Sequence, residues 1–152
     1  MKNNIATIFI CMAICMCATG VGAYEIDDDL VNAIAQVESS NNRLAYNERT
    51  RCAGLLQISE IVLQEWNEDT EIDVEPRHYE KIDLFNEQIS RQIGTWYLKR
   101  LRDRYGCPTL RDCLAAYNFG IDACRRVNFE WERYPKSVRA YVDKVIRIYE
   151  RI

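Results

Sequence analysis

Residues 30–38 read LVNAIAQVE, and they place one acidic side chain on the apolar face of a predicted helix. An α-helix turns by about 100° per residue, so Leu30, Ile34 and Glu38 fall on the same side of it. Burial disfavours the charged form of a carboxyl group, and the negative end of the helix dipole disfavours it further. Both effects raise the pKa of Glu38, as a general acid near neutral pH requires. A solvated glutamate, or one paired with an arginine, is the alternative interpretation of this helix.

The rest of the chain is predicted to be mostly α-helical, with at most a vestigial β-hairpin. The predicted helices are 28–39, one that starts near Ser59, one from Asp83 to Tyr105, one capped by Thr109, a short one over 122–127 and one after Pro135. The polar, acidic stretch 67–80 is predicted to be a loop. Trp96, Tyr97 and Tyr149 are assigned to the core because they continue apolar helical stripes.

The first residues read as a secretory signal. A short positively charged start with Lys2 precedes an apolar or small stretch over 5–18, and Val21 and Ala23 stand at the −3 and −1 positions of a cleavage site. We therefore expect residues 1–23 to be removed and 24–152 to form one domain, exported to the periplasm or the extracellular space. An uncleaved membrane anchor is the alternative.

Four cysteines remain in the predicted mature chain: Cys52, Cys107, Cys113 and Cys124. An even number in an exported chain predicts two disulfides, with three possible connectivities. We favour Cys107 with Cys113, which flank a predicted helix start, and this leaves Cys52 with Cys124. No metal site is expected, because the spacings are not CxxC-like and the chain has one histidine.

The charge balance is mixed. The formal net charge is −3, and no basic stripe of the kind that follows a phosphate backbone is present in the sequence. We therefore expect no nucleic-acid partner, and we expect a monomer.

Four short segments stand out together: ESSN (38–41), GLLQI (54–58), AYNFG (116–120) and YVDKV (141–145). In this order, after a signal segment, they resemble the catalytic domain of the lytic transglycosylases, the SLT branch of the lysozyme-like superfamily. That family's pattern reads roughly as ES, GLMQI, AYNAG and a tyrosine on the last helix. The resemblance covers about residues 30–149, and it implies a lysozyme-like fold and peptidoglycan glycan strands as the substrate.

The resemblance implies that Glu38 protonates the leaving oxygen of a MurNAc–GlcNAc β-1,4 bond. Glu38 then acts as a base on the C6 hydroxyl of the same muramic sugar, which closes a 1,6-anhydro ring. This reaction consumes no water and needs no cofactor, no metal and no second catalytic carboxylate.

Further site residues carry over from the same motifs. Gln57 and Asn118 are expected to hold the substrate near the cleaved bond, and capping of neighbouring helices is their alternative role. Tyr141 is expected to bond the catalytic carboxyl and orient it, Tyr117 to stack on a sugar, and Ser39 to position the glycan or the acid. Core packing is the alternative for both tyrosines, and a helix-terminal turn is the alternative for Ser39.

Two positions depart from the family pattern. Leu56 replaces the usual Met, a volume-conserving change that is expected to be tolerated. Phe119 replaces Ala, which adds bulk at the cleft edge and is expected to alter which glycan subsites are open.

Two other functions remain open from the sequence. A hydrolytic muramidase, similar to goose-type lysozyme, would need a second carboxylate to activate water, and the candidates lie in one acidic stretch: Asp69, Glu71, Asp73 and Glu75. A non-catalytic peptidoglycan-binding accessory of a secretion apparatus would keep the fold without the activity. The compact domain also suits an enzyme that opens local gaps for a secretion or conjugation machine.

Overall fold

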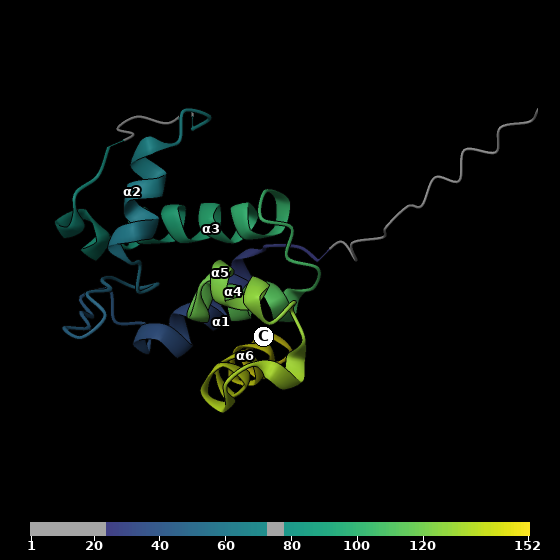
Figure 1. The fold of residues 1–152 in the computed structure, drawn as a ribbon. Coiled ribbons are helices and arrows are strands. Elements are labelled where there is room, and N and C mark those ends of the chain that lie inside the picture. The colour runs from purple at the N-terminus through teal and green to yellow at the C-terminus, as the bar shows by residue number, and fades with distance from the viewer. Residues whose placement is uncertain (1–23, 73–77) are drawn as a thin grey trace, which may run out of the picture.

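Helices account for all the regular elements of residues 24–72 and 78–152, which are those that the computed structural model describes (Figure 1). The α-helices are α1 (Asp28–Ser39), α2 (Glu60–Glu68), α3 (Glu87–Asp103), α4 (Leu110–Phe119), α5 (Ile121–Arg126) and α6 (Lys136–Tyr149). Two 3-10 helices, η1 (Lys81–Phe85) and η2 (Trp131–Arg133), complete the set. The predicted signal segment lies outside the described residues.

The prediction of a mostly α-helical domain is confirmed. No strand forms within the described residues, and two isolated bridges, Tyr46 to Ala53 and Ala53 to Ile58, are the vestige of a hairpin. Among the same residues, no helix is long and apolar enough to cross a membrane.

The core lies between α1, α4 and α6. Leu30 and Ile34 of α1 are fully buried, as are Val142 and Val145 of α6. Figure 1 shows these helices gathered together with α5, whereas α3 runs alongside them and α2 lies beyond α3. The end of α6 is tied to the start of α1, because the Tyr149 hydroxyl donates a hydrogen bond of 2.8 Å to Asp27, the N-cap of α1. This contact and the buried side chains of both helices hold α1 against α6.

The start of the long helix α3 differs from the sequence prediction. Asn86 is its N-cap, since the Asn86 side chain accepts hydrogen bonds from the backbone N–H groups of Gln88 and Ile89. The side chain of Asp83 also accepts a backbone hydrogen bond, but the donor is the N–H of Glu80, at 2.8 Å, at the start of the shorter helix η1. Asp83 and Asn86 therefore each serve at the start of a different helix. The residues around Asp83, which we predicted to begin α3, form the separate 3-10 helix η1.

The aromatic assignments hold only in part. Tyr97 is buried in the core, but Trp96 and Tyr149 are half-buried at its edge. The side chains of Trp96 and Tyr149 are therefore partly exposed, although their positions on apolar helix faces predicted burial.

The predicted disulfides do not form in the structure, where all four cysteines of the described residues are free thiols. Cys107 and Cys113 are both buried, and the thiol of Cys113 donates to the carbonyl oxygen of Leu98 on α3 at 3.7 Å. Cys52 lies in the loop after α1, whereas Cys124 is buried on α5. Cysteine spacing predicts how many bridges are possible, but the helices decide which thiols meet, and the prediction is wrong here.

The GLLQI segment docks onto α3. The buried hydroxyl of Ser90 accepts a hydrogen bond of 3.1 Å from the backbone N–H of Leu56. The Leu56 side chain is fully buried and lies directly over Gly94, so the change from Met is accommodated by the core. Gly54 turns the chain into this segment at a φ of +80°, against the backbone of Leu84.

Replacement of Gly54 by alanine is therefore expected to destabilise the fold by about 3 kcal/mol or more, because it combines backbone strain with a steric clash. An added Cβ would collide with the carbonyl oxygen of Leu84. Gly106→Ala is the matched control, since Gly106 also has a positive φ, +71°, but open space around it. The control is expected to lose about 1 kcal/mol. Equal losses for the two variants in urea unfolding would contradict the close approach.

Candidate active site

Glu38 lies in the last turn of α1, whose end is closed by three hydrogen bonds to one carbonyl oxygen. The carbonyl of Ala35 accepts from the backbone N–H groups of Ser40 and Asn41 and, at 3.1 Å, from the Ser39 hydroxyl. Ser40 adopts the left-handed conformation typical of a helix end, with a φ of 55°. Ser39 therefore takes part in the turn that ends α1, and its expected role in positioning the glycan or the acid stays a prediction.

The carboxyl group of Glu38 is largely removed from water. Burial raises its pKa from 4.5 to about 7, and the interaction with the Tyr141 hydroxyl lowers it by a smaller amount. No arginine or lysine is among the influences on this carboxyl. The two alternative interpretations, a solvated and an arginine-paired glutamate, are therefore wrong, and Glu38 can hold a proton near neutral pH.

Tyr141 brings a buried hydroxyl from α6 to the carboxyl of Glu38. Burial and the charge of Glu38 raise the pKa of this phenol well above its usual value. The hydroxyl makes no hydrogen bond of good geometry to any described group, although it is close enough to Glu38 to stabilise the carboxylate. We therefore regard the contact between them as a loose hydrogen bond, which the carboxyl can tighten when it loses its proton.

Tyr117 connects α4 to the GLLQI segment. Its hydroxyl donates a hydrogen bond of 2.9 Å to the carbonyl oxygen of Leu56, and its ring lies 5.8 Å from that of Tyr97. Burial and the charge of Glu38 raise the pKa of Tyr117. The hydroxyl is thus committed to the backbone, and only the ring of Tyr117 is left to face a ligand.

A cleft of about 530 Å³ lies between the loop that precedes α2 and the junction of α4 with α5. Its walls include three of the predicted site residues and the departure Phe119: Gln57, Tyr117, Asn118 and Phe119. Asn118 and Phe119 are exposed. Glu38, Ser39 and Tyr141 are not among the wall residues. Glu38 is half-buried, and its charge acts on Tyr117, so it lies close to this wall residue of the cleft.

Gln57 is held in an unusual conformation at the cleft wall. Its φ of 47° is left-handed, which is uncommon for a residue other than glycine. The side-chain Nε2 donates to the carbonyl oxygens of Ala45, at 3.1 Å, and Gly54, at 3.0 Å. Both amide hydrogens are used, so Oε1 is the atom that remains to accept a hydrogen bond from a ligand. Ser59 caps α2, so Gln57 does not have the capping role that was its alternative.

Of the carboxylates considered for water activation, the two described ones, Asp69 and Glu71, are not among the walls of this cleft. Asp69 is buried and accepts hydrogen bonds from Arg100, at 2.8 Å, and from the indole of Trp96, at 3.2 Å. Glu71 is exposed on the same side of α2, outside the cleft walls. Asp73 and Glu75 lie outside the described residues.

Sequence reasoning missed two acidic residues of the cleft wall, Glu65 and Asp122. Glu65 lies one helical turn after Ile61, which also lines the cleft. The Oε2 atom of Glu65 accepts from the Tyr105 hydroxyl at 2.8 Å and pairs with Arg100 at 3.3 Å. The shared helical face of Ile61 and Glu65 was the available signal.

The family model described as Transglycosylase SLT domain matches residues 18–139, most of the chain. The fold, the buried glutamate and this match together place the chain in the transglycosylase SLT domain family, whose domain implies cleavage of peptidoglycan in a transglycosylase reaction. The match includes Glu38, Gln57 and Asn118 and stops two residues before Tyr141. No curated protein matches the chain.

The raised pKa of Glu38 predicts a pH-dependent stability. A carboxyl whose folded pKa is about 7, against 4.5 when unfolded, stabilises the protein at low pH, and this contribution is lost as the pH rises through about 7. Glu38→Gln does not titrate, so relative to wild type it is expected to gain up to about 3 kcal/mol between about pH 5 and pH 8.

Urea unfolding at the two pH values measures this gain. Glu48→Gln, which changes an exposed glutamate, is the matched control and is expected to differ from wild type by much less between them. A Glu38→Gln difference that stays constant with pH would mean that the carboxyl is solvated.

Proposed function

We propose that this protein is a lytic transglycosylase that cleaves the MurNAc–GlcNAc β-1,4 bond of peptidoglycan and leaves 1,6-anhydro-MurNAc ends. The observation that carries the proposal is the carboxyl group of Glu38, which lies close to the cleft residue Tyr117 and has a pKa raised by burial to about 7. Membership of the SLT family supplies the substrate class.

In the first step the protonated carboxyl of Glu38 donates its proton to the glycosidic oxygen. The bond between this oxygen and C1 of the muramic sugar breaks, and positive charge develops at C1. A pKa of about 7 means that a large share of the Glu38 carboxyls carry a proton at neutral pH, as the first step requires.

In the second step the carboxylate of Glu38 removes the proton of the C6 hydroxyl. The oxygen of that hydroxyl bonds to C1 and closes the anhydro ring, which returns Glu38 to its protonated form. Glu38 gains and loses its negative charge during the reaction, and burial disfavours that charge. A nearby hydroxyl whose hydrogen bond to the carboxyl becomes stronger when the carboxyl is charged would stabilise the charged form. The loosely bonded hydroxyl of Tyr141 is suited to this role.

Gln57 is proposed to orient the substrate together with Asn118. The Oε1 atom of Gln57 is an acceptor in a fixed place, because two backbone carbonyls hold its Nε2, and it suits the N–H of a substrate acetamido group. Asn118 lies on the opposite wall, at the end of α4. Strain at Gln57, with its left-handed φ, is consistent with a functional position.

The hydrolytic alternative would require a base that activates water at the cleft. The acidic residues of the cleft wall are Glu65, whose Oε2 is held by Arg100 and Tyr105, and Asp122, which lies 3.8 Å from Arg125. The proposed reaction needs no such base, because the C6 hydroxyl of the substrate attacks C1 and Glu38 takes its proton. Export to the periplasm or the extracellular space, a monomeric state and service to an envelope-spanning machine remain predictions from the sequence.

The test is mass spectrometry of the soluble products that the protein releases from purified peptidoglycan. We expect muropeptides with 1,6-anhydro ends, which are one water lighter than hydrolytic products. Glu38→Gln is expected to fold and to lose a factor of about 10²–10⁴ in rate, the usual contribution of a general acid and base.

Glu65→Gln is the matched control, since it neutralises the other glutamate of the cleft region. It is expected to yield the same anhydro products as wild type. Reducing ends from the wild-type protein, lost in Glu65→Gln, would instead establish the hydrolytic alternative. A folded wild-type protein that releases no products would favour the accessory role.

A further inference from the structure

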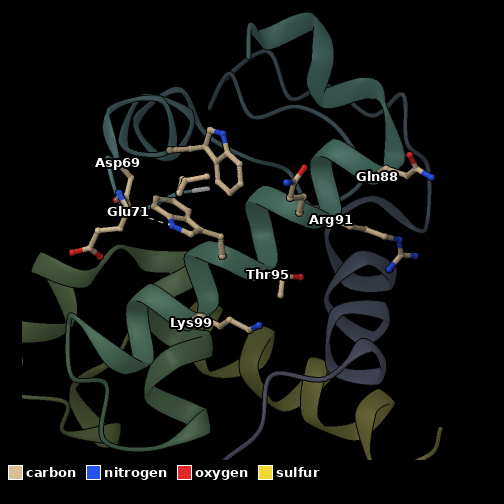
Figure 2. A pocket seen from close by; sticks show the side chains of 10 residues that line it. Asp69, Glu71, Gln88, Arg91, Thr95 and Lys99 are labelled. Atoms are coloured by element: carbon tan, nitrogen blue, oxygen red, sulfur yellow. Dashed lines mark hydrogen bonds between the residues drawn. The ribbon is translucent and has the colours of Figure 1, made fainter. Parts of the chain in front are cut away.

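A second hollow, of about 760 Å³, lies against α3 and shares no wall residue with the cleft (Figure 2). Its walls come from the end of α2, the residues that follow it and one face of α3: Trp66, Asp69, Glu71, Ile72, Gln88, Arg91, Gln92, Thr95, Trp96 and Lys99. The inner face of α3, with Ile93 and Tyr97, packs into the core. The hollow is therefore on the side of α3 that the proposed reaction does not use.

The α3 wall presents polar side chains at helical spacing. Gln88, Gln92, Thr95 and Lys99 follow one another at intervals of three or four residues, so they share a face that extends over about 16 Å of helix. Figure 2 shows Gln88 near the start of α3 and Thr95 and Lys99 further along the same helix. Two amides, a hydroxyl and an ammonium group form a row of hydrogen-bonding groups on a helix face that a simple core-packing role does not require.

The indole of Trp96 lies in this hollow in a fixed orientation. Its Nε1 donates to Asp69 at 3.2 Å, and its ring meets that of Trp66 edge-on at 5.4 Å. The guanidinium of Arg100 lies 5.1 Å from the centre of the Trp96 ring. An aromatic ring that is already immobilised loses little conformational entropy when a ligand binds it.

Arg91 also lines the hollow, but its charge is already engaged. It donates to Glu87 and to Asn32, each at 2.9 Å. With Asp69 paired to Arg100, the hollow is not strongly cationic and so does not favour an anionic polymer. A fixed aromatic ring beside amide and hydroxyl groups matches a ligand that has apolar C–H faces and many hydroxyl and acetamido groups.

We propose that this hollow is a second, non-catalytic binding site that holds an N-acetylated glycan strand of peptidoglycan against α3. The choice of polymer rests on the peptidoglycan substrate of the proposed function. A strand held here keeps the enzyme on the polymer while the cleft engages other bonds, since two linked contacts raise the effective concentration of the substrate.

The two binding regions share one rigid support. Arg100 pairs with Asp69 at 2.8 Å on the side of the second hollow and with Glu65 at 3.3 Å at the wall of the cleft. The side chain of Arg100 is mostly buried, so this connection is held in place by packing.

The test is co-sedimentation with purified peptidoglycan in the inactive Glu38→Gln background, where the polymer stays intact. Adding Gln92→Ala and Lys99→Ala is expected to raise the apparent dissociation constant by about fivefold or more. Gln64→Ala with Lys144→Ala is the matched control, because both residues are exposed on other helices, and it is expected to leave binding unchanged. Equal binding by the two double variants would overturn the proposal.

Two further measurements identify the occupant. Trp96→Leu, checked for folding by circular dichroism, is expected to weaken binding to the same extent or more. The loss in the Gln92/Lys99 variant should persist on glycan strands stripped of their peptides. A loss that vanishes on stripped strands would overturn the glycan as the occupant and indicate the stem peptides.

Binding is read in an inactive protein, whereas the proposed reaction is read from the products of the active one. The two experiments can therefore fail independently. A wild-type protein that forms no anhydro ends can still bind peptidoglycan through α3, and a protein that forms them can lack this second binding site.

Discussion

The removal of one carboxyl group from water is the interaction on which the account of this protein depends. Glu38 is placed by the last turn of α1, and the buried residues Leu30 and Ile34 hold that helix in the core. Burial supplies the rise of the pKa to about 7, and Tyr141 from α6 opposes it. At high pH the charged form of Glu38 lowers the stability of the folded protein, because its carboxylate is largely buried. The packing of α1 with α6 compensates for this loss.

Much of the fold could be predicted because its local signals agree with its packing. The apolar period of α1 and the cap residues Ser59 and Thr109 predicted helices that the structure contains. The start of α3 could not be resolved, since Asp83 and Asn86 are both good caps and only the packing of η1 decides between them. The cysteine pairs failed for a related reason, because spacing does not say which way a helix turns its thiols.

The candidate site was predictable in its residues but less so in their roles. Glu38 stood out because an acid on an apolar stripe is rare, and this signal needs no tertiary information. The commitment of the Tyr117 hydroxyl to Leu56 and the left-handed backbone of Gln57 depend on contacts distant in sequence. Glu65 was missed and Trp96 was assigned to the core. The local sequence does not distinguish a residue at the edge of the core from one inside it.

The proposed mechanism requires that Glu38 carries a proton near neutral pH. A carboxyl-carbon NMR titration of Glu38 measures its pKa directly. Comparison of spectra from the wild-type protein and Glu38→Gln assigns the resonance. We expect a midpoint at about pH 7, because burial raises the pKa of this carboxyl. A midpoint near the ordinary value of about 4.3 would contradict this expectation, because Glu38 would then be a solvated carboxylate with no proton to donate at neutral pH.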